Sequence, residues 1–358
     1  MSSSFPPEPN PYLAARTDDA DGPHVGQAIN QPARVAKRPR WWTTLAVVCA
    51  SLVVFIAAST VMTVVAFALV HGEITMAMFS SVDAMQEVLA SRVGLFVMVV
   101  TPQLMLVLPA LVAAWLSPVE TRRRLGLVRG NWPVWTWFAA AAATPLVGLV
   151  SSVIVGQFMT ESASLKMMSD VFRSHGQSGF LIPLALMIGA TPAICEELLF
   201  RGYVQTRLTK SAGPIVGILI ASTLFAAFHM DFVHVIAVLP LGMFLGWVSW
   251  RSASLFPAII GHFVNNVISV VAVVYAPEEQ SDVLAVPAIM VSLSIIGLGM
   301  MGIAVVIAAS VLYGHPDRGH SDQDRDLARG IEPATGIEPA TGIESASGHE
   351  PTATSELA

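Results

Sequence analysis

The sequence is poor in charged residues and in cysteine. Asp, Glu, Lys and Arg make up 12% of its 358 residues and the mean hydropathy is +0.65, whereas about 25% of residues are charged in an ordinary soluble protein. A chain of this length cannot bury so much apolar surface in one water-soluble core, which excludes a soluble globular protein. Cys49 and Cys195 both lie in apolar segments. They predict no disulfide framework, and we interpret them as small buried hydrophobic residues.

Long apolar runs take the place of the missing charges. A helix that crosses the hydrocarbon core of a membrane needs about 20 predominantly apolar residues. The sequence contains eight candidate segments, at residues 42–70, 94–116, 133–157, 179–200, 214–230, 233–250, 255–276 and 284–313. These segments predict an all-α, polytopic membrane protein with about eight transmembrane helices.

The basic residues predict how the spans are oriented. Cytoplasmic loops of membrane proteins retain Lys and Arg. If the N-terminus is cytoplasmic, only Arg92, Lys166 and Arg173 of the 19 basic residues fall outside the cytoplasmic segments. An even number of spans returns the C-terminus to the cytoplasm, so we expect a multi-pass plasma-membrane protein with both termini cytoplasmic.

The chain divides into two polar tails and three apolar regions. Residues 1–40 are rich in Pro, Ser, Asp and Ala and are expected to form a disordered cytoplasmic tail ahead of a retained first span. Residues 314–358 contain the repeat "GIEPATGIEPATGIESASG" and are expected to be a disordered, low-complexity tail. Between the tails we expect spans 1–3 in residues 41–178, a catalytic core of spans 4–7 in residues 179–276, and a last span in residues 277–313.

Ionisable and amide side chains inside the spans predict a functional site. A charged residue at the centre of a membrane helix costs at least about 2.5–3.5 kcal/mol, so it is expected to face a partner or a cavity. The candidates lie between residues 190 and 270, and they are Glu196, Glu197, His229, His234, His262, Asn265 and Asn266. Among them we interpret His234 as an interfacial residue and Asn265 as a packing amide.

The candidates can meet at one depth. If spans 4 and 5 form an antiparallel hairpin that turns at residues 211–214, Glu196 and His229 are level, because each lies about 16–17 residues from the turn at a rise of 1.5 Å per residue. His262 reaches the same depth if the polar segment 201–213 projects beyond the next cytoplasmic turn. The predicted site therefore lies in the cytoplasmic half of the membrane.

The two adjacent glutamates are expected to have different roles. Residues four apart on a helix share one face, which pairs Glu197 with Arg201. Glu196 is rotated by about 100° from Glu197. We therefore expect Glu197 and Arg201 to form a structural ion pair and Glu196 to face the histidines.

Two further pairs share helix faces, Phe225 with His229 and His262 with Asn266. Two imidazoles, a carboxylate and an amide in a dry cavity can hold either a metal ion or a water molecule. If a divalent metal is bound, zinc with an open coordination position is the natural choice, with Glu196, His229 and His262 as its ligands. Without a metal, Glu196 can deprotonate a water molecule held by the histidines and later protonate a leaving amine.

The three motifs Glu196-Glu197-x-x-x-Arg201, Phe225-x-x-x-His229 and His262-x-x-x-Asn266, in this order, carry a family resemblance. They resemble the motifs of the CPBP family, the CAAX-protease and bacteriocin-processing (Abi) intramembrane endopeptidases, over about residues 180–275. The resemblance implies that a membrane-associated peptide, prenylated or a leader peptide, is hydrolysed. It implies a catalytic centre formed by Glu196, His229, His262 and Asn266, supported by Glu197, Arg201 and Phe225.

Several alternatives stay open from the sequence. The family is commonly labelled metalloprotease, yet a metal-free mechanism that depends on glutamate fits the same residues. A non-enzymatic role, as an inactive scaffold, an immunity factor or a small-solute transporter, is the competing class; a transporter predicts an internal repeat, and we find no such pairing between the halves of the chain. The expected partners are a membrane-embedded peptide or protein and the lipid bilayer, and the net charge of −6 gives no reason to expect nucleic acid.

Overall fold

The computed structural model describes residues 41–275 and 286–313. The expectations for the tails at residues 1–40 and 314–358 lie outside the described residues. Within the described ranges the regular structure is helical throughout, as the apolar runs predict.

Among the described residues, seven helices are long and apolar enough to cross a membrane. They are α1 (Trp41–His71), α3 (Arg92–Trp115), α5 (Val134–Phe158), a long interrupted helix over Ala163–Ala212, α10 (Phe232–Ser252), α11 (Phe256–Tyr275) and α12 (Val286–Leu312). The prediction of an all-α polytopic membrane protein is confirmed. Three short helices, η1 (Met76–Ser80), α2 (Val82–Ala90) and α4 (Thr121–Arg124), join the spans in the first part of the chain.

The predicted fifth span is shorter than expected. It forms α9 (Pro214–Ala227), which has 14 residues; a helix of that length extends about 21 Å, less than the ~30 Å of the hydrocarbon core. His229 therefore lies in the turn between α9 and α10 and not on a membrane helix. Met230 has a φ of 54°, in the left-handed region that a helix cannot continue through.

The long helix changes its geometry twice. Its consecutive parts are α6 (Ala163–His175), η2 (Gly176–Phe180), α7 (Leu181–Glu196), the π-helical η3 (Glu197–Gln205) and α8 (Thr206–Ala212). A kink separates α6 from α7, because Gly179 has a φ of +81°, a conformation that glycine adopts without strain. The π-helical part begins directly after Glu196. Wide turns of this kind are rare in proteins overall, and those that occur often lie at functional sites.

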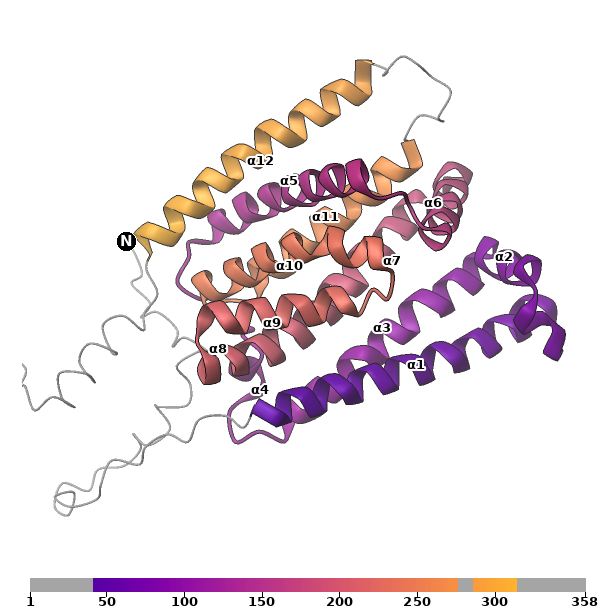
Figure 1. Ribbon diagram of the computed structural model, residues 1–358, viewed down its shortest axis with the longest axis horizontal. Helices are drawn as coiled ribbons and strands as arrows, with labels where there is room; N and C mark the ends of the chain where they lie inside the picture. The colour runs from indigo at the N-terminus through magenta and orange to yellow at the C-terminus, as the bar shows by residue number, and fades with distance from the viewer. Residues whose placement is uncertain (1–40, 276–285, 314–358) are drawn as a thin grey trace, which may run out of the picture. The chain divides into compact units, whose positions relative to one another are not determined.

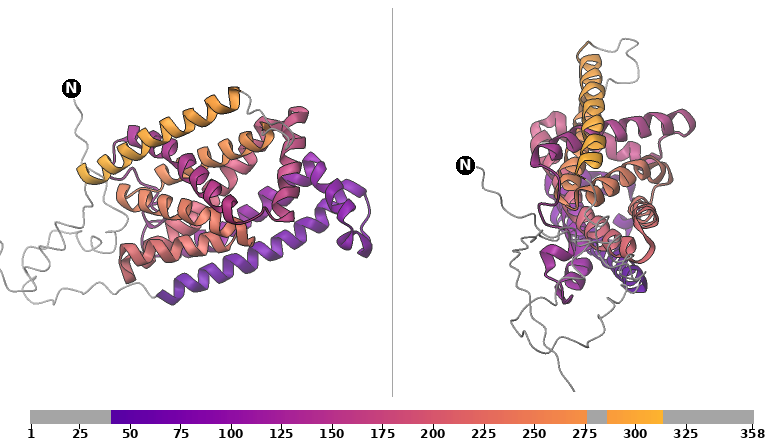
Figure 2. Two further views of the ribbon diagram at one scale, coloured as in Figure 1. Left: turned by 45° about the horizontal axis from the view of Figure 1, so that its top comes forward. Right: turned by 90° about the vertical axis from the view of Figure 1, so that its left-hand side faces the viewer.

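The helices pack as two flanks around a central group. Helix α1 packs along α3, α12 packs along α5, and α11 contacts both α5 and α7. Figures 1 and 2 show α1 and α12 on opposite flanks of the helices between them. The predicted core, formed by α7, η3, α9 and α11, therefore packs together with α3 from the first part of the chain.

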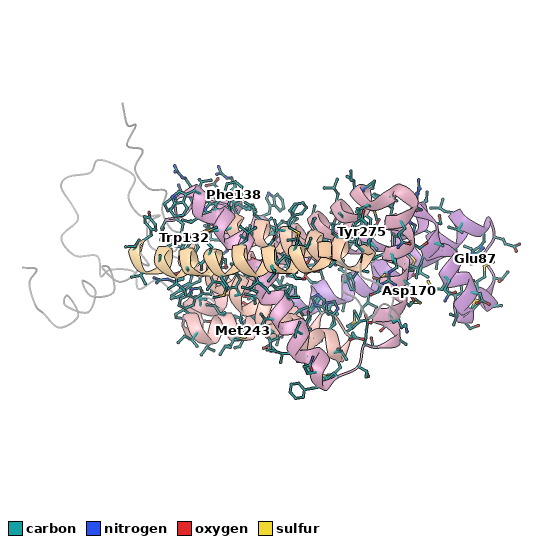
Figure 3. All side chains as sticks on the ribbon, turned by 90° about the horizontal axis from the view of Figure 1, so that it is seen from above. Glu87, Trp132, Phe138, Asp170, Met243 and Tyr275 are labelled. Atoms are coloured by element: carbon teal, nitrogen blue, oxygen red, sulfur yellow. The ribbon has the colours of Figure 1, made fainter. Side chains whose placement is uncertain are left out.

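Basic residues from separate parts of the chain gather at one end of this bundle. Arg207 in α8 donates a hydrogen bond from Nη1 to Oγ1 of Thr43 at 2.9 Å. Burial and the nearby charge of Arg207 lower the pKa of Arg124, the last residue of α4. Figure 1 shows α4, α8 and the start of α1 at the same end. Acidic Glu87 and Asp170 lie towards the opposite end from Trp132 (Figure 3).

Candidate functional site

Two buried glutamates lie where α7 changes into η3. Glu196 ends α7 and is 8% exposed, and Glu197 begins the π-helical turn and is fully buried. Carboxylates in such an environment need partners, because an isolated buried charge is very costly. Their partners differ, and they define the site.

Arg201 holds Glu197 as the sequence predicts. Its Nη1 lies 2.7 Å from Oε1 of Glu197, and both side chains are fully buried. Its Nη2 donates to the carbonyl oxygen of Gly242 at 3.0 Å, and its guanidinium lies 4.2 Å from the centre of the Phe225 ring. Phe225 therefore has the supporting position expected of it.

A pair of glycines on α10 makes this approach possible. Arg201 and Gln205, four residues apart, donate to the carbonyl oxygens of Gly242 and Gly246, which are also four residues apart, at 3.0 and 2.9 Å. A Cβ on Gly242 would lie 3.0 Å from Cδ1 of Phe225. Small residues with this spacing let helix backbones come close in a membrane, and here they provide carbonyl partners for buried donors.

His262 joins the two glutamates. Its Nδ1 lies 3.0 Å from Oε1 of Glu197, and its Nε2 lies 3.9 Å from Oε2 of Glu196. A carboxylate only accepts hydrogen bonds, so Nδ1 carries the proton, and in the neutral ring Nε2 is an acceptor that faces Glu196. From helical spacing, Arg201 is the only partner expected for Glu197. The structure corrects this, because Glu197 also orients the imidazole of His262.

His229 approaches the glutamates from the turn after α9. Its Nδ1 donates to the carbonyl oxygen of Phe225 at 3.2 Å, which leaves Nε2 available for another partner. The ring of His234 lies 4.5 Å from that of His229, centre to centre. The interpretation of His234 as an interfacial residue is therefore incomplete, since it packs edge to face on a site histidine.

Asp231 stabilises the turn that contains His229. This carboxylate caps α10 by accepting a hydrogen bond from the backbone N–H of His234 at 3.0 Å. Hydrogen bonds from Ser162, from that N–H and from Ser164 hold the pKa of Asp231 below its usual value. Because the folded-state pKa is lowered, this contribution to stability is present at neutral pH and is lost as the pH falls through that pKa.

Asn266 forms hydrogen bonds with groups other than the predicted catalytic residues. Its Nδ2 donates to the carbonyl oxygen of Ile188 at 3.2 Å, and its Oδ1 accepts from Asn265 at 3.2 Å. Pro192 lies four residues after Ile188 inside α7, and proline has no N–H to bond that carbonyl. Asn266 supplies the missing donor, and neither of these two bonds reaches Glu196 or the site histidines. Its catalytic role stays a prediction.

A cavity of about 140 Å³ opens beside Glu196. Its polar lining residues are Glu196, His229 and Gln103, and its apolar ones are Phe55, Leu106, Phe200 and Phe228. The predicted level arrangement of Glu196 and His229 agrees with this shared cavity. The sequence analysis missed Gln103, although it is the only side-chain amide among residues 94–116.

The residues predicted as metal ligands do not form a close cluster. In the described part of the chain, no group of three or more His, Cys, Asp or Glu side chains is arranged to hold a metal ion. Glu196, His229 and His262 as placed here do not fit a three-ligand centre. We therefore derive no chemical step through a metal.

Comparison with known protein families identifies this region. Residues 178–268 match a family model described as type II CAAX prenyl endopeptidase Rce1-like. No curated protein and no solved structure matches the chain significantly. The matched segment begins at the kink before α7 and includes all three sequence motifs. Over residues 178–268 this multi-pass membrane chain is thus similar to the CAAX-protease (CPBP) family of intramembrane endopeptidases.

Proposed function

We propose that this protein hydrolyses a peptide bond of a membrane-associated peptide, with Glu196 as the general base. The observation that carries the proposal is the position of Oε2 of Glu196. This atom is buried, has no hydrogen-bond partner among the described residues, and lies 3.9 Å from Nε2 of His262. The separation is too long for a direct hydrogen bond and suits a bridging water molecule.

The chemical steps follow from these atoms. Glu196 takes a proton from the water molecule while the water oxygen bonds to the carbonyl carbon of the substrate. The π electrons of that carbonyl group move to the carbonyl oxygen, which becomes the oxyanion. The imidazole of His229, which lines the same cavity, is the candidate donor to this oxyanion, and such a hydrogen bond lowers the energy of the transition state. When the carbon–nitrogen bond breaks, the carboxyl group of Glu196 gives its proton to the leaving amine.

The substrate class is proposed from the lining of the cavity. Four apolar residues, Phe55, Leu106, Phe200 and Phe228, surround the polar groups, which favours a peptide with an apolar side chain or a lipid-modified peptide that arrives from the bilayer. The family match supports a prenylated substrate with a CAAX-type C-terminus. We accordingly place the reaction at the cysteine carbonyl, with a tripeptide as the leaving amine.

The proposal is tested with the purified protein in detergent or nanodiscs. A farnesylated CAAX-type peptide and the same peptide without the farnesyl group are incubated with the protein, and the released tripeptide is measured by mass spectrometry. We expect cleavage of the farnesylated peptide by the wild-type protein and none by a protein without the Glu196 carboxyl group. Binding without cleavage would instead support the scaffold alternative.

The same assay examines the metal question. After treatment with a chelator and measurement of metal content, a mechanism based on this chain's own residues predicts unchanged cleavage. Loss of cleavage that stoichiometric zinc restores would overturn the metal-free mechanism and leave the peptidase assignment intact.

We also propose that the end with α4 and α8 faces the cytoplasm, in a plasma-membrane protein with both termini cytoplasmic. In this topology the short helix α9 and the turn after it carry the chain from α8 to the start of α10, so that the number of crossings stays even. The basic residues at this end support the orientation, because Lys and Arg are retained on the cytoplasmic side. A reporter active only in the cytoplasm, fused after residue 313, should be active; inactivity of this fusion, with activity of a reporter fused after residue 72, would reverse the orientation.

A further inference from the structure

Gln103 of α3 reaches the site from outside the segment that defines the family. Its Nε2 donates a hydrogen bond to Oε1 of Glu196 at 3.1 Å, and it lines the cavity with Glu196 and His229. The family match begins at residue 178, so the match assigns nothing to this helix. The three sequence motifs likewise assign no role to α3.

The hydrogen bond distinguishes the two oxygens of Glu196. Oε1 accepts from Gln103, whereas Oε2 has no hydrogen-bond partner in residues 41–275 and 286–313 and faces Nε2 of His262. The terminal torsion of a glutamate is broad and roughly two-fold, so a carboxylate without a fixed oxygen can turn either atom away from His262. Gln103 restricts this rotation.

The side-chain oxygen of Gln103 is not used by the hydrogen bond to Glu196. Its Oε1 is buried without a partner in the described structure, although buried polar atoms in proteins are nearly always hydrogen-bonded. One atom fixes Glu196, and the other is an acceptor left over for a hydrogen-bond donor that enters during the reaction.

We propose that Gln103 is a positioning residue for the peptidase reaction: it fixes Oε1 of Glu196 so that Oε2 is aimed at the water molecule to be deprotonated. This inference rests on the proposed function. It makes α3 a part of the active centre, so that the catalytic unit extends beyond residues 178–268.

The test compares Gln103→Met with Thr101→Val in the peptide-cleavage assay. Methionine has nearly the same length and shape but cannot donate a hydrogen bond to Glu196. Thr101 lies two residues earlier on the same helix and does not line the cavity, so its replacement removes a polar group from α3 without touching the site. Loss of a hydrogen bond to a charged group predicts a fall in kcat of roughly 10- to 100-fold in Gln103→Met, with KM and melting temperature close to wild type.

Thr101→Val should retain wild-type kcat. If Gln103→Met cannot be purified in folded form, Gln103→Asn replaces it, because asparagine keeps the amide but is one methylene too short to reach Glu196. Wild-type kcat in the folded variant, or equal losses in kcat, substrate binding and melting temperature, would overturn the positioning role.

Glu196→Gln in the same series separates the two proposals. If it is inactive while the Gln103 variant keeps wild-type kcat, only the positioning role fails. If Glu196→Gln cleaves as well as the wild type, or the wild type itself cleaves neither peptide, the proposed function fails and the role of Gln103 with it.

Discussion

Replacing Glu196 with Gln is expected to lower the rate of peptide cleavage by roughly 10²- to 10⁴-fold, the range that general acid–base groups contribute. The amide oxygen of glutamine can still accept the hydrogen bond from Gln103, so the fold around the site is expected to persist. What is lost is a group that can take a proton from water and return it to the leaving amine. Initial rates of tripeptide release, with the melting temperature measured in parallel, give the result.

Two other glutamates serve as controls for this variant. Glu120 is exposed and belongs to a surface ion pair with Arg123, so Glu120→Gln should leave cleavage unchanged. Glu197→Gln should mainly lower stability, because Glu197 is fully buried between Arg201 and His262. Wild-type cleavage by a folded Glu196→Gln protein would contradict the general-base role.

Replacing Arg201 with Met is expected to destabilise the protein by about 3–5 kcal/mol, the usual cost of removing one partner from a buried ion pair. The guanidinium is fully buried and interacts with Glu197, with the carbonyl oxygen of Gly242 and with the Phe225 ring. Methionine fills a similar volume but leaves the carboxylate of Glu197 without its guanidinium and the carbonyl of Gly242 without its donor. Reversible unfolding in mixed detergent micelles measures the loss.

A surface arginine and a double variant make this measurement specific. Arg123 is 43% exposed on its side chain and pairs with Glu120 at 3.4 Å, so Arg123→Met should cost no more than about 1 kcal/mol. Replacing Arg201 by Met and Glu197 by Gln together should cost less than the sum of the single changes, because no unpaired charge is left. Additive losses would indicate that the two side chains do not interact as the structure shows.

The two large effects separate the roles of the adjacent glutamates. Glu196 is expected to be needed for the reaction and Glu197 for the arrangement around it, which agrees in part with the helical phase expected from the sequence. That phase assumed a regular helix. The π-helical turn that begins at Glu197 changes the angles between successive side chains, and both carboxylates consequently face His262.

Some of the predicted contacts depend only on spacing along one helix. The pair Glu197 and Arg201 could be predicted because residues four apart on a helix are neighbours in almost any fold. His229 was predicted on a helix, and it lies instead in a turn, because α9 ends at Ala227. Asn266 was expected beside the histidines, but the proline in α7 leaves a carbonyl that this amide satisfies.

The sequence alone was enough to predict a helical membrane protein, the resemblance of residues 178–268 to the CAAX-protease family, and the gathering of ionisable residues between residues 190 and 270. Scarce charge, long apolar runs and motif spacing are local properties, and the cost of burying polar groups in lipid makes them informative. Only the tertiary structure decided which oxygen of which glutamate faces His262 and which residue of α3 reaches Glu196. Gln103 and Glu196 are 93 residues apart in the chain, and no periodicity in one helix specifies the rotation of another helix against it.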